Sequence, residues 1–406
     1  AVDIAPLREH PQFRRLFAGD TVSFVGTQMT AVAAPVQVYA LTRSSFAVGL
    51  LGLAALVPLV VFGLLGGAIA DAVDRRKLAL ATSSGLAVLS VALFAQALLS
   101  VDRVWVVYLL VGLQAALFAV DSPTRRTFAP RLLPDRQMPA AMALQQIGMG
   151  LGMTVGPLVA GALIAAFGLS TAYGVDAATF GAALYAIRRL DAMAPDGGGR
   201  RPGLASVLEG LRFLRTRRVL LMTFLVDINA MVFGMPRALF PALAVGTFGG
   251  GARTVGLLYA GPAVGALVAA ALSGPLTRVR RQGLAVLVSV AAWGASVTLF
   301  GLTSTLWLGF LLLALAGGSD AVSAVFRMSI LNVATPDEMR GRLNGVFIVV
   351  VAGGPRLGDL EAGAAASLVS PAFSVISGGL ACLAGVALLA SLVPSFARYD
   401  AEHPTA

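Results

Sequence analysis

Apolar runs of roughly 20 residues, the length that a helix needs to cross a bilayer, recur along nearly the whole 406-residue chain. A helix suits lipid because it satisfies its own backbone hydrogen bonds. Charged residues make up 12% of the chain, whereas they make up roughly a quarter of a soluble domain. The sequence therefore predicts an all-α, multi-pass membrane protein.

We expect twelve transmembrane helices, separated by charged, glycine or proline residues. The predicted spans are 17–41, 46–70, 78–100, 104–124, 140–166, 170–190, 219–246, 254–276, 283–301, 304–330, 343–368 and 372–393. The long connection divides them into two sets of six. The predicted domains are an N-terminal six-helix bundle (1–190), a cytoplasmic linker (191–218) and a C-terminal six-helix bundle (219–406). Within the linker, 204–217 is amphipathic and basic, which favours a helix along the membrane surface.

The basic residues predict how the chain is oriented. If both termini are cytoplasmic, 25 of the 30 basic residues face the cytoplasm, and only Arg43, Arg103 and Arg253 face the other side. This bias is the positive-inside pattern of a bacterial cytoplasmic (inner) membrane protein. The same residues lie in short turns without interleaved aromatic residues, so we do not expect a nucleic-acid partner.

The two sets of spans repeat each other. Shifts of 207 residues early in each set and 202 residues later superpose matching positions. The matches are Asp20 with Asp227, Gly49 with Gly256, Gly67 with Gly274, Arg125 with Arg327, and Gly161 with Gly363. Two pseudo-symmetric halves around a midplane site are typical of alternating-access transporters.

A turn with five charges in seven residues, 71–77, joins the second and third spans. With Gly67, Asp71, Arg75 and Arg76 it matches the signature Gly-x-x-x-Asp-x-x-x-Arg-Arg of the major facilitator superfamily, which the chain resembles over its full length. The resemblance implies a gating set of Gly67, Asp71, Arg75, Arg76, Asp121 and Arg125. In it, Asp71, Arg75 and Asp121 would clasp the halves on the cytoplasmic side.

Several segments are similar to the siderophore-export branch of that superfamily. They include 35–38, 237–244, 256–260 and 335–345. Macrolide and multidrug exporters resemble much of the same sequence. The chain departs from the branch at 355–361, which contains three charges in a predicted span.

Charges at membrane depth are costly and usually face a cavity, a partner or an ion path. We interpret Arg237 and Arg356 as candidates for attracting an anionic or catecholate-like substrate. The alternative is that each neutralises a nearby carboxylate. Further residues that could line the cavity, or merely pack, are Gln28, Phe118, Asn229 and Phe233.

The candidates for proton coupling are four carboxylates: Asp20, Asp227, Asp359 and Glu361. Asp20 and Asp227 occupy equivalent positions in the two halves, where they could instead bridge loops at the gate. Asp359 lies three residues from Arg356 on the same helix face, so we expect these two to pair. Glu361 is then the carboxylate of these two that is better placed to take up and release a proton.

The remaining sequence favours a secondary transporter over an enzyme. The single lysine, Lys77, does not end a phosphate-binding glycine loop, and one cysteine with two terminal histidines offers no metal or nucleophile site. We expect no cofactor and no metal. The predicted function is proton-coupled, alternating-access export of a small amphipathic molecule, a siderophore, by a monomer. The alternatives are a multidrug or macrolide efflux pump, uptake, or a non-transporting receptor or membrane enzyme.

Overall fold

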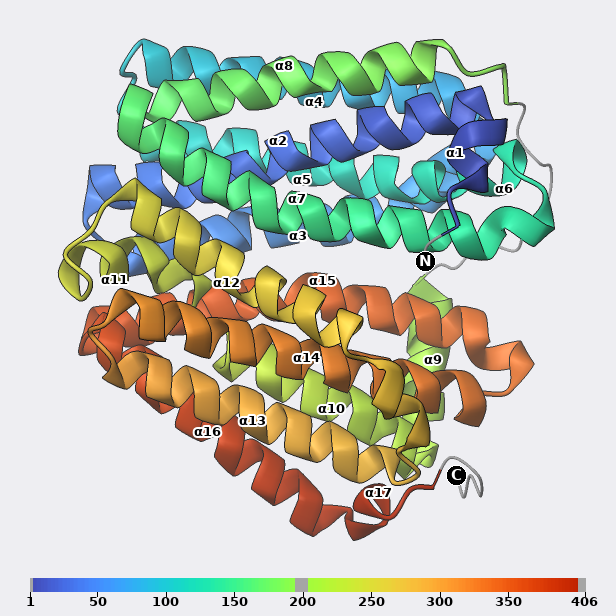
Figure 1. The fold of residues 1–406 in the computed structure, drawn as a ribbon, viewed down its shortest axis with the longest axis vertical. Helices are drawn as coiled ribbons and strands as arrows, with labels where there is room; N and C mark the ends of the chain where they lie inside the picture. The colour runs from blue at the N-terminus through green and yellow to red at the C-terminus, as the bar shows by residue number, and fades with distance from the viewer. Residues whose placement is uncertain (1–2, 194–203, 401–406) are drawn as a thin grey trace. The chain divides into compact units, whose positions relative to one another are not determined.

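The computed structural model describes residues 3–193 and 204–400, without the side chains of 64–72, 204–208, 277, 337–338, 341, 344 and 348. Most of this part is helical (Figure 1). The long helices are α2 (Pro11–Thr42), α3 (Ser45–Ala72), α4 (Arg75–Leu98), α5 (Val104–Arg126), α7 (Met138–Phe167), α8 (Leu169–Arg188), α10 (Arg218–Phe233), α12 (Ala252–Ala271), α13 (Gln282–Leu302), α14 (Leu306–Ala334), α15 (Asp337–Leu368) and α16 (Pro371–Leu392). The shorter ones are α1 (Ala5–Glu9), α6 (Phe128–Leu132), η1 (Asp135–Gln137), α9 (Leu204–Thr216), η2 (Arg237–Leu239), α11 (Phe240–Gly246), η3 (Gly274–Arg278) and α17 (Pro394–Ala397).

A helix occupies each of the twelve predicted ranges. In the described residues, nine segments are long and apolar enough to cross a membrane. The helices α2, α8 and α15 are not among these nine, and each carries charged or polar residues within its length. The twelve-helix, six-plus-six arrangement itself stays a prediction.

The predicted span 219–246 matches one of the nine membrane-length segments, Arg218–Gly246, but this segment is not one continuous helix. Helix α10 ends at Phe233, and a short break precedes η2 and α11. Pro236 lies in the break, and proline has no backbone N–H and disfavours helical geometry in the residue before it. The indole N–H of Trp293 instead donates to the carbonyl of Gly234 at 2.7 Å. The break places Arg237 at the start of η2.

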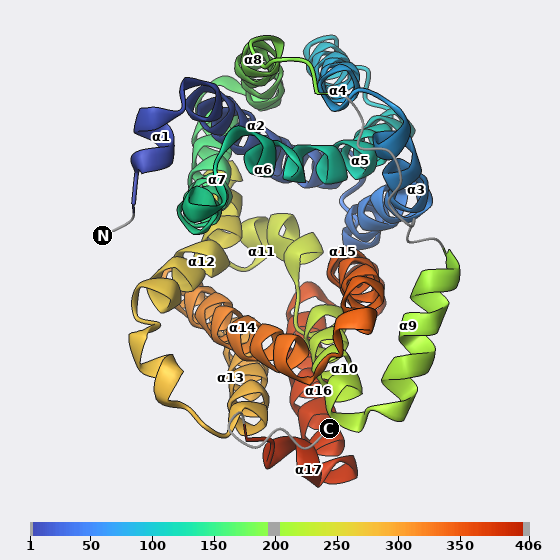
Figure 2. The same ribbon diagram turned by 90° about the vertical axis from the view of Figure 1, so that its right-hand side faces the viewer.

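The chain forms two compact units. Unit 1 comprises Ala1–Thr42, Ala54–Arg201 and Gly251–Gly256, and unit 2 comprises Arg43–Leu53, Pro202–Gly250 and Leu257–Ala406. In unit 1, α2 and α4 both pack against α8 (Figure 2). In unit 2, α13 packs between α14 and α16, and α10 adds to the same core.

The glycines matched by the sequence repeat form close helix crossings inside each unit. In unit 1, a Cβ added to Gly161 of α7 would lie 3.1 Å from the Cα of Gly256, near the start of α12. In unit 2, a Cβ added to Gly363 of α15 would lie 3.3 Å from the Cα of Gly49, near the start of α3. Small residues let helix backbones approach this closely. The matched glycines therefore occupy equivalent helix contacts in the two units, as well as equivalent positions in the sequence.

Helix α9 covers nearly all of the predicted amphipathic segment 204–217 and packs on α15 within unit 2. The carboxylate of Glu209 pairs with the guanidinium of Arg342 at 2.7 Å. A Cβ added to Gly210 would lie 3.1 Å from the carbonyl oxygen of Arg342. Helix α9 of the linker is thus bound to α15 at Glu209 and Gly210. Its position on the membrane surface stays a prediction.

We expect Gly317→Val to prevent unit 2 from packing correctly. A Cβ at Gly317 of α14 would overlap the backbone of Pro262 on α12, which has no flexible end that could move aside. The cost should reach the upper part of the range for overpacking, about 3 kcal/mol. Size-exclusion chromatography in detergent should show little monodisperse protein. Gly181→Val is the matched control, since nothing lies within 4 Å of the added Cβ, and equal yields of the two variants would contradict this account.

Candidate functional site

Arg125 of α5 is the centre of an ion cluster in unit 1. Its guanidinium pairs with the carboxylates of Asp20 on α2 and Asp121 one turn earlier on α5, and donates to the Ser83 hydroxyl at 2.7 Å. The hydroxyl of Thr82 donates to the other oxygen of Asp121. One guanidinium thus joins α2, α4 and α5 through three acceptors, which its planar fork suits well.

Unit 2 contains the equivalent pair. The guanidinium of Arg327 on α14 pairs with the carboxylate of Asp227 on α10, and these side chains are only 7% and 4% exposed. A second carboxylate, Asp320, lies 3.4 Å from Arg327. Asp227 and Arg327 are the residues that the sequence repeat superposes on Asp20 and Arg125, so the two units share this ion pair.

A second charged group in unit 2 surrounds the break after α10. The carboxylate of Asp359 on α15 accepts the backbone N–H of Ala238 at 3.1 Å. Arg237 and Arg356 lie close enough to stabilise the negative charge of Asp359. The Arg356 guanidinium also donates to the Ala352 carbonyl, and the hydroxyl of Tyr259 donates to the Arg237 carbonyl at 3.1 Å.

The two charged groups of unit 2 together contain three guanidiniums and three carboxylates. The three guanidiniums are Arg237, Arg327 and Arg356, and the three carboxylates are Asp227, Asp320 and Asp359. An anionic ligand that replaces a protein carboxylate on one of these guanidiniums leaves that carboxylate without its cation. The group remains neutral as a whole only if the displaced carboxylate takes up a proton.

The predicted gating residues are described only in part. Gly67 and Asp71 lie within 64–72, so their side chains are outside the described residues. Arg75 begins α4, and its backbone N–H donates to Met193 at 3.1 Å. The Arg76 guanidinium donates to carbonyls at the end of α8, at 2.7 Å for Arg188. The start of α4 is therefore hydrogen-bonded to the end of α8 and to the residues that follow it. The role of this turn in gating stays a prediction.

The four predicted lining residues have different surroundings. The Asn229 amide is buried and donates to the Cys382 carbonyl at 2.9 Å, so it joins α10 to α16. Gln28 is half-buried, and a Cβ added to Gly156 of α7 would lie 2.6 Å from its Cβ. Phe118 and Phe233 are 48% and 38% exposed. Gln28 and Phe118 belong to unit 1, whereas Asn229 and Phe233 belong to unit 2, and their role in lining a cavity stays a prediction.

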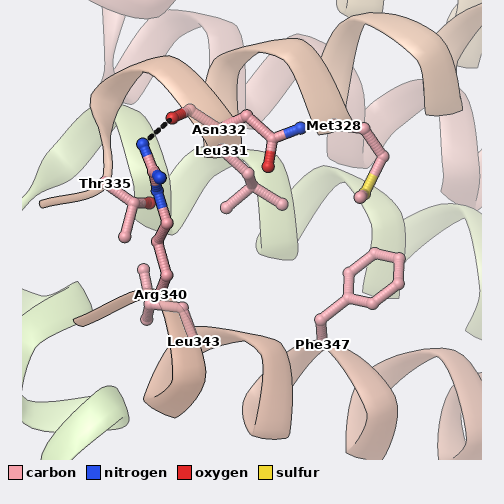
Figure 3. Close-up of a pocket in the computed structure, with 7 residues that line it drawn as sticks. All are labelled: Met328, Leu331, Asn332, Thr335, Arg340, Leu343 and Phe347. Atoms are coloured by element: carbon pink, nitrogen blue, oxygen red, sulfur yellow. Dashed lines mark hydrogen bonds between the residues drawn. The ribbon is translucent and has the colours of Figure 1, made fainter. Parts of the chain in front are cut away.

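A cavity of about 370 Å³ opens between the end of α14 and the start of α15 (Figure 3). Its lining is mostly apolar and consists of Met328, Leu331, Asn332, Thr335, Arg340, Leu343 and Phe347. The guanidinium of Arg340 donates to the Asn332 carbonyl at 3.5 Å. Apolar walls with one cation suit an amphipathic anion. Among the described residues that line this cavity, none is a predicted binding residue.

Comparison with known proteins identifies the family of the chain. The family model described as a transmembrane secretion effector (MFS_3) matches residues 1–404. The chain belongs to the major facilitator superfamily. This superfamily member is 31% identical to the enterobactin exporter EntS of Citrobacter koseri over 99% of its own length and 97% of the relative's. It is 32% identical to EntS of Shigella boydii serotype 18, over 97% and 94% of the two chains.

Solved structures agree with the fold of this superfamily member. A bacterial homologue of the human lysosomal transporter Spinster has a TM-score of 0.71 at 16% identity, covering 97% of each chain. The nucleoside transporter NupG has a TM-score of 0.68 at 14% identity, covering 95% of this chain and 98% of its own. At these identities the likeness shows the fold alone, which is that of a multi-pass membrane transporter.

Two carboxylates on the long helices of this superfamily member are absent from the set predicted from sequence: Asp176, which is buried, and Asp320, whose side chain is 36% exposed. Asp320 belongs to the ion group of unit 2, and Asp176 lies on α8 among hydroxyl groups. Each is an acidic residue inside an otherwise apolar run of the sequence. This pattern alone could have identified both residues as candidates. Glu361, which was singled out, is half-buried.

Proposed function

We propose that this protein exports a siderophore by proton-coupled alternating access. The observation that carries the proposal is the similarity to enterobactin exporters over nearly the full length of both chains. A relationship of this extent includes every helix that could line a transport path. Enterobactin is thus the first substrate to test.

The charges of unit 2 support the choice of an anionic or catecholate substrate. Arg237 and Arg356 carry planar guanidiniums, which stack on aromatic rings and donate hydrogen bonds to oxygen atoms. Before a ligand arrives, Asp359 offsets one of the two positive charges of Arg237 and Arg356. A substrate that displaces this carboxylate would free it to bind a proton, which is one way to couple the two movements.

The basic residues of the chain support one orientation of the protein in the membrane. With both termini in the cytoplasm of a bacterium, the inner membrane is the site of action and the basic turns face inward. The protein would work as a monomer with two six-helix halves that expose one site to each side in turn. An inward proton gradient would drive export.

The proposal can be tested in an enterobactin-producing Escherichia coli strain whose own exporter gene is deleted. The strain is grown under iron limitation with or without this protein, and catechol siderophore in the medium is measured. Expression should restore extracellular enterobactin. Unchanged enterobactin, together with increased resistance to a macrolide such as erythromycin, would instead identify a drug efflux pump.

Arg356→Gln should weaken enterobactin transport without unfolding the protein. Removing one charge-assisted hydrogen bond costs about 1.5–3 kcal/mol, so we expect KM to rise roughly 10- to 100-fold. The measurement is initial export rate against internal substrate concentration in the strain described above. The control is Arg253→Gln, an exposed arginine at the start of α12. A KM that is the same in both variants would exclude Arg356 from substrate binding.

A further inference from the structure

Asp176 is a fully buried carboxylate in the middle part of α8. Its side chain lies inside unit 1, with 1% of the residue exposed. One oxygen, Oδ2, accepts hydrogen bonds from the Thr30 hydroxyl of α2 at 2.7 Å and the Ser90 hydroxyl of α4 at 2.8 Å. The other oxygen, Oδ1, is buried and has no hydrogen-bond partner in the part of the chain that the structure describes.

The surroundings of Asp176 contain no cation among the described residues. Tyr173, one turn away on α8, is the titratable group whose charge interacts with that of Asp176. The sequence of α7 has no titratable residue, α4 carries its charges at its first three positions, and α8 carries its only other charge at its last residue. The nearest charged residues of α2 and α5 along those helices, Asp20 and Asp121, are bound to Arg125.

A buried ionised carboxylate without a cation is strongly disfavoured, and such a group becomes neutral by taking up a proton. The two hydroxyl groups oppose this preference, because both donate to Oδ2 and so stabilise the ionised form. Oδ1 is then the atom that receives the proton. Both protonation states have a structural basis, whereas Asp20 and Asp227 are each paired with an arginine.

A chain of hydrogen bonds leads from Asp176 toward a less buried part of unit 1. The Gln114 amide of α5 donates to the Ser90 hydroxyl at 3.1 Å, and Ser90 in turn donates to Asp176. Gln114 is half-buried. Four helices, α2, α4, α5 and α8, therefore contribute to one polar layer that contains a single carboxylate.

We propose that Asp176 is a proton-binding site that couples transport to the proton gradient. This inference rests on the proposed function. A proton from water forms an O–H bond at Oδ1 and changes the charge of the side chain from −1 to 0, and its release to the opposite side restores the carboxylate. The donor–acceptor distances from Thr30 and Ser90 to Oδ2 are those of ordinary hydrogen bonds between protein groups. Only one of the two carboxylate oxygens accepts hydrogen bonds from the described residues. Both observations favour a proton over a sodium ion as the bound species.

Infrared difference spectroscopy of the purified, full-length protein in lipid tests the site without any substrate. We expect a carbonyl band of a protonated carboxylic acid that shifts in heavy water, disappears as the pH rises, and is absent from Asp176→Asn. Asp102→Asn, an exposed residue in the turn before α5, should keep the band. If Asp176→Asn retains the full band, Asp176 is ionised and the inference is wrong.

Transport assays in proteoliposomes test the coupling. With enterobactin as the probe, Asp176→Asn should retain exchange of labelled for unlabelled substrate but lose at least 10-fold of the accumulation driven by a pH gradient. Equal gradient-driven accumulation in wild type and variant would overturn the inference, as would a requirement for sodium. If wild type transports no enterobactin, the proposed function fails, while the infrared result still decides whether Asp176 binds a proton.

Should Asp176→Asn fail to fold, Thr30→Val provides a second variant. It removes a donor to the ionised form, so the acid band should persist to a higher pH than in wild type. A band with unchanged pH dependence would count against Asp176 as its source.

Discussion

Arg327→Ala should destabilise unit 2 by about 3–5 kcal/mol, because removing one partner of a buried ion pair leaves the other charge uncompensated. Here two carboxylates would remain, Asp227 with 4% of its side chain exposed and Asp320 nearby. The unfolding free energy can be measured by denaturant titration in mixed micelles. A loss of this size removes much of the total stability of a typical domain.

The double variant Asp227→Asn with Arg327→Gln separates the pair from the packing around it. Replacing both charges with neutral groups of similar size should recover a large part of the stability, since Asp227 is then no longer an uncompensated buried charge. If the single and double variants are equally unstable, then shape and not charge dominates at this site.

Arg125→Ala should destabilise unit 1 by roughly 1–3 kcal/mol. It leaves Asp20 and Asp121 close together without a cation. The cost should be smaller than for Arg327→Ala, because 22% of the Arg125 side chain and 33% of the Asp20 side chain are exposed, so solvent screens the remaining charges.

Arg126→Ala is the matched control for Arg125→Ala, since Arg126 is the next residue along α5 and is exposed. It should change the thermal unfolding midpoint little. The order expected is Arg327→Ala, then Arg125→Ala, then Arg126→Ala, from the largest loss of stability to the smallest. A larger loss for Arg125→Ala than for Arg327→Ala would contradict the dependence on burial.

Much of the helical arrangement could be predicted from the sequence, because bilayer thickness sets the length of each apolar run. The repeat gave the positions of the equivalent pairs, Asp20 with Arg125 and Asp227 with Arg327, but not the pairing itself. Asp20 and Arg125 are 105 residues apart, and periodicity says nothing about which helices become neighbours. In the same way, the repeat marks Gly161 and Gly256 in the sequence but does not show that the helices carrying them cross at these glycines.

Other features depend on contacts that no local pattern encodes. The partners of Asp176 are hydroxyls 146 and 86 residues away along the chain, so its environment is visible only in the fold. The break at Pro236 was accessible to sequence reasoning, since proline marks helix ends, but the apolar run around it was long enough to read as one span. Asp359 lies near Arg237 as well as near Arg356, and its pairing with Arg356 stays a prediction.

The most direct test of proton-coupled siderophore export is flux in proteoliposomes that contain only this protein. Vesicles with an acidic interior and an alkaline exterior, oriented so that the cytoplasmic side faces outward, are supplied with enterobactin. The account predicts that enterobactin accumulates inside and that a protonophore abolishes the accumulation. Accumulation that is the same with and without the pH gradient, or that is absent for enterobactin while a macrolide accumulates, would contradict it.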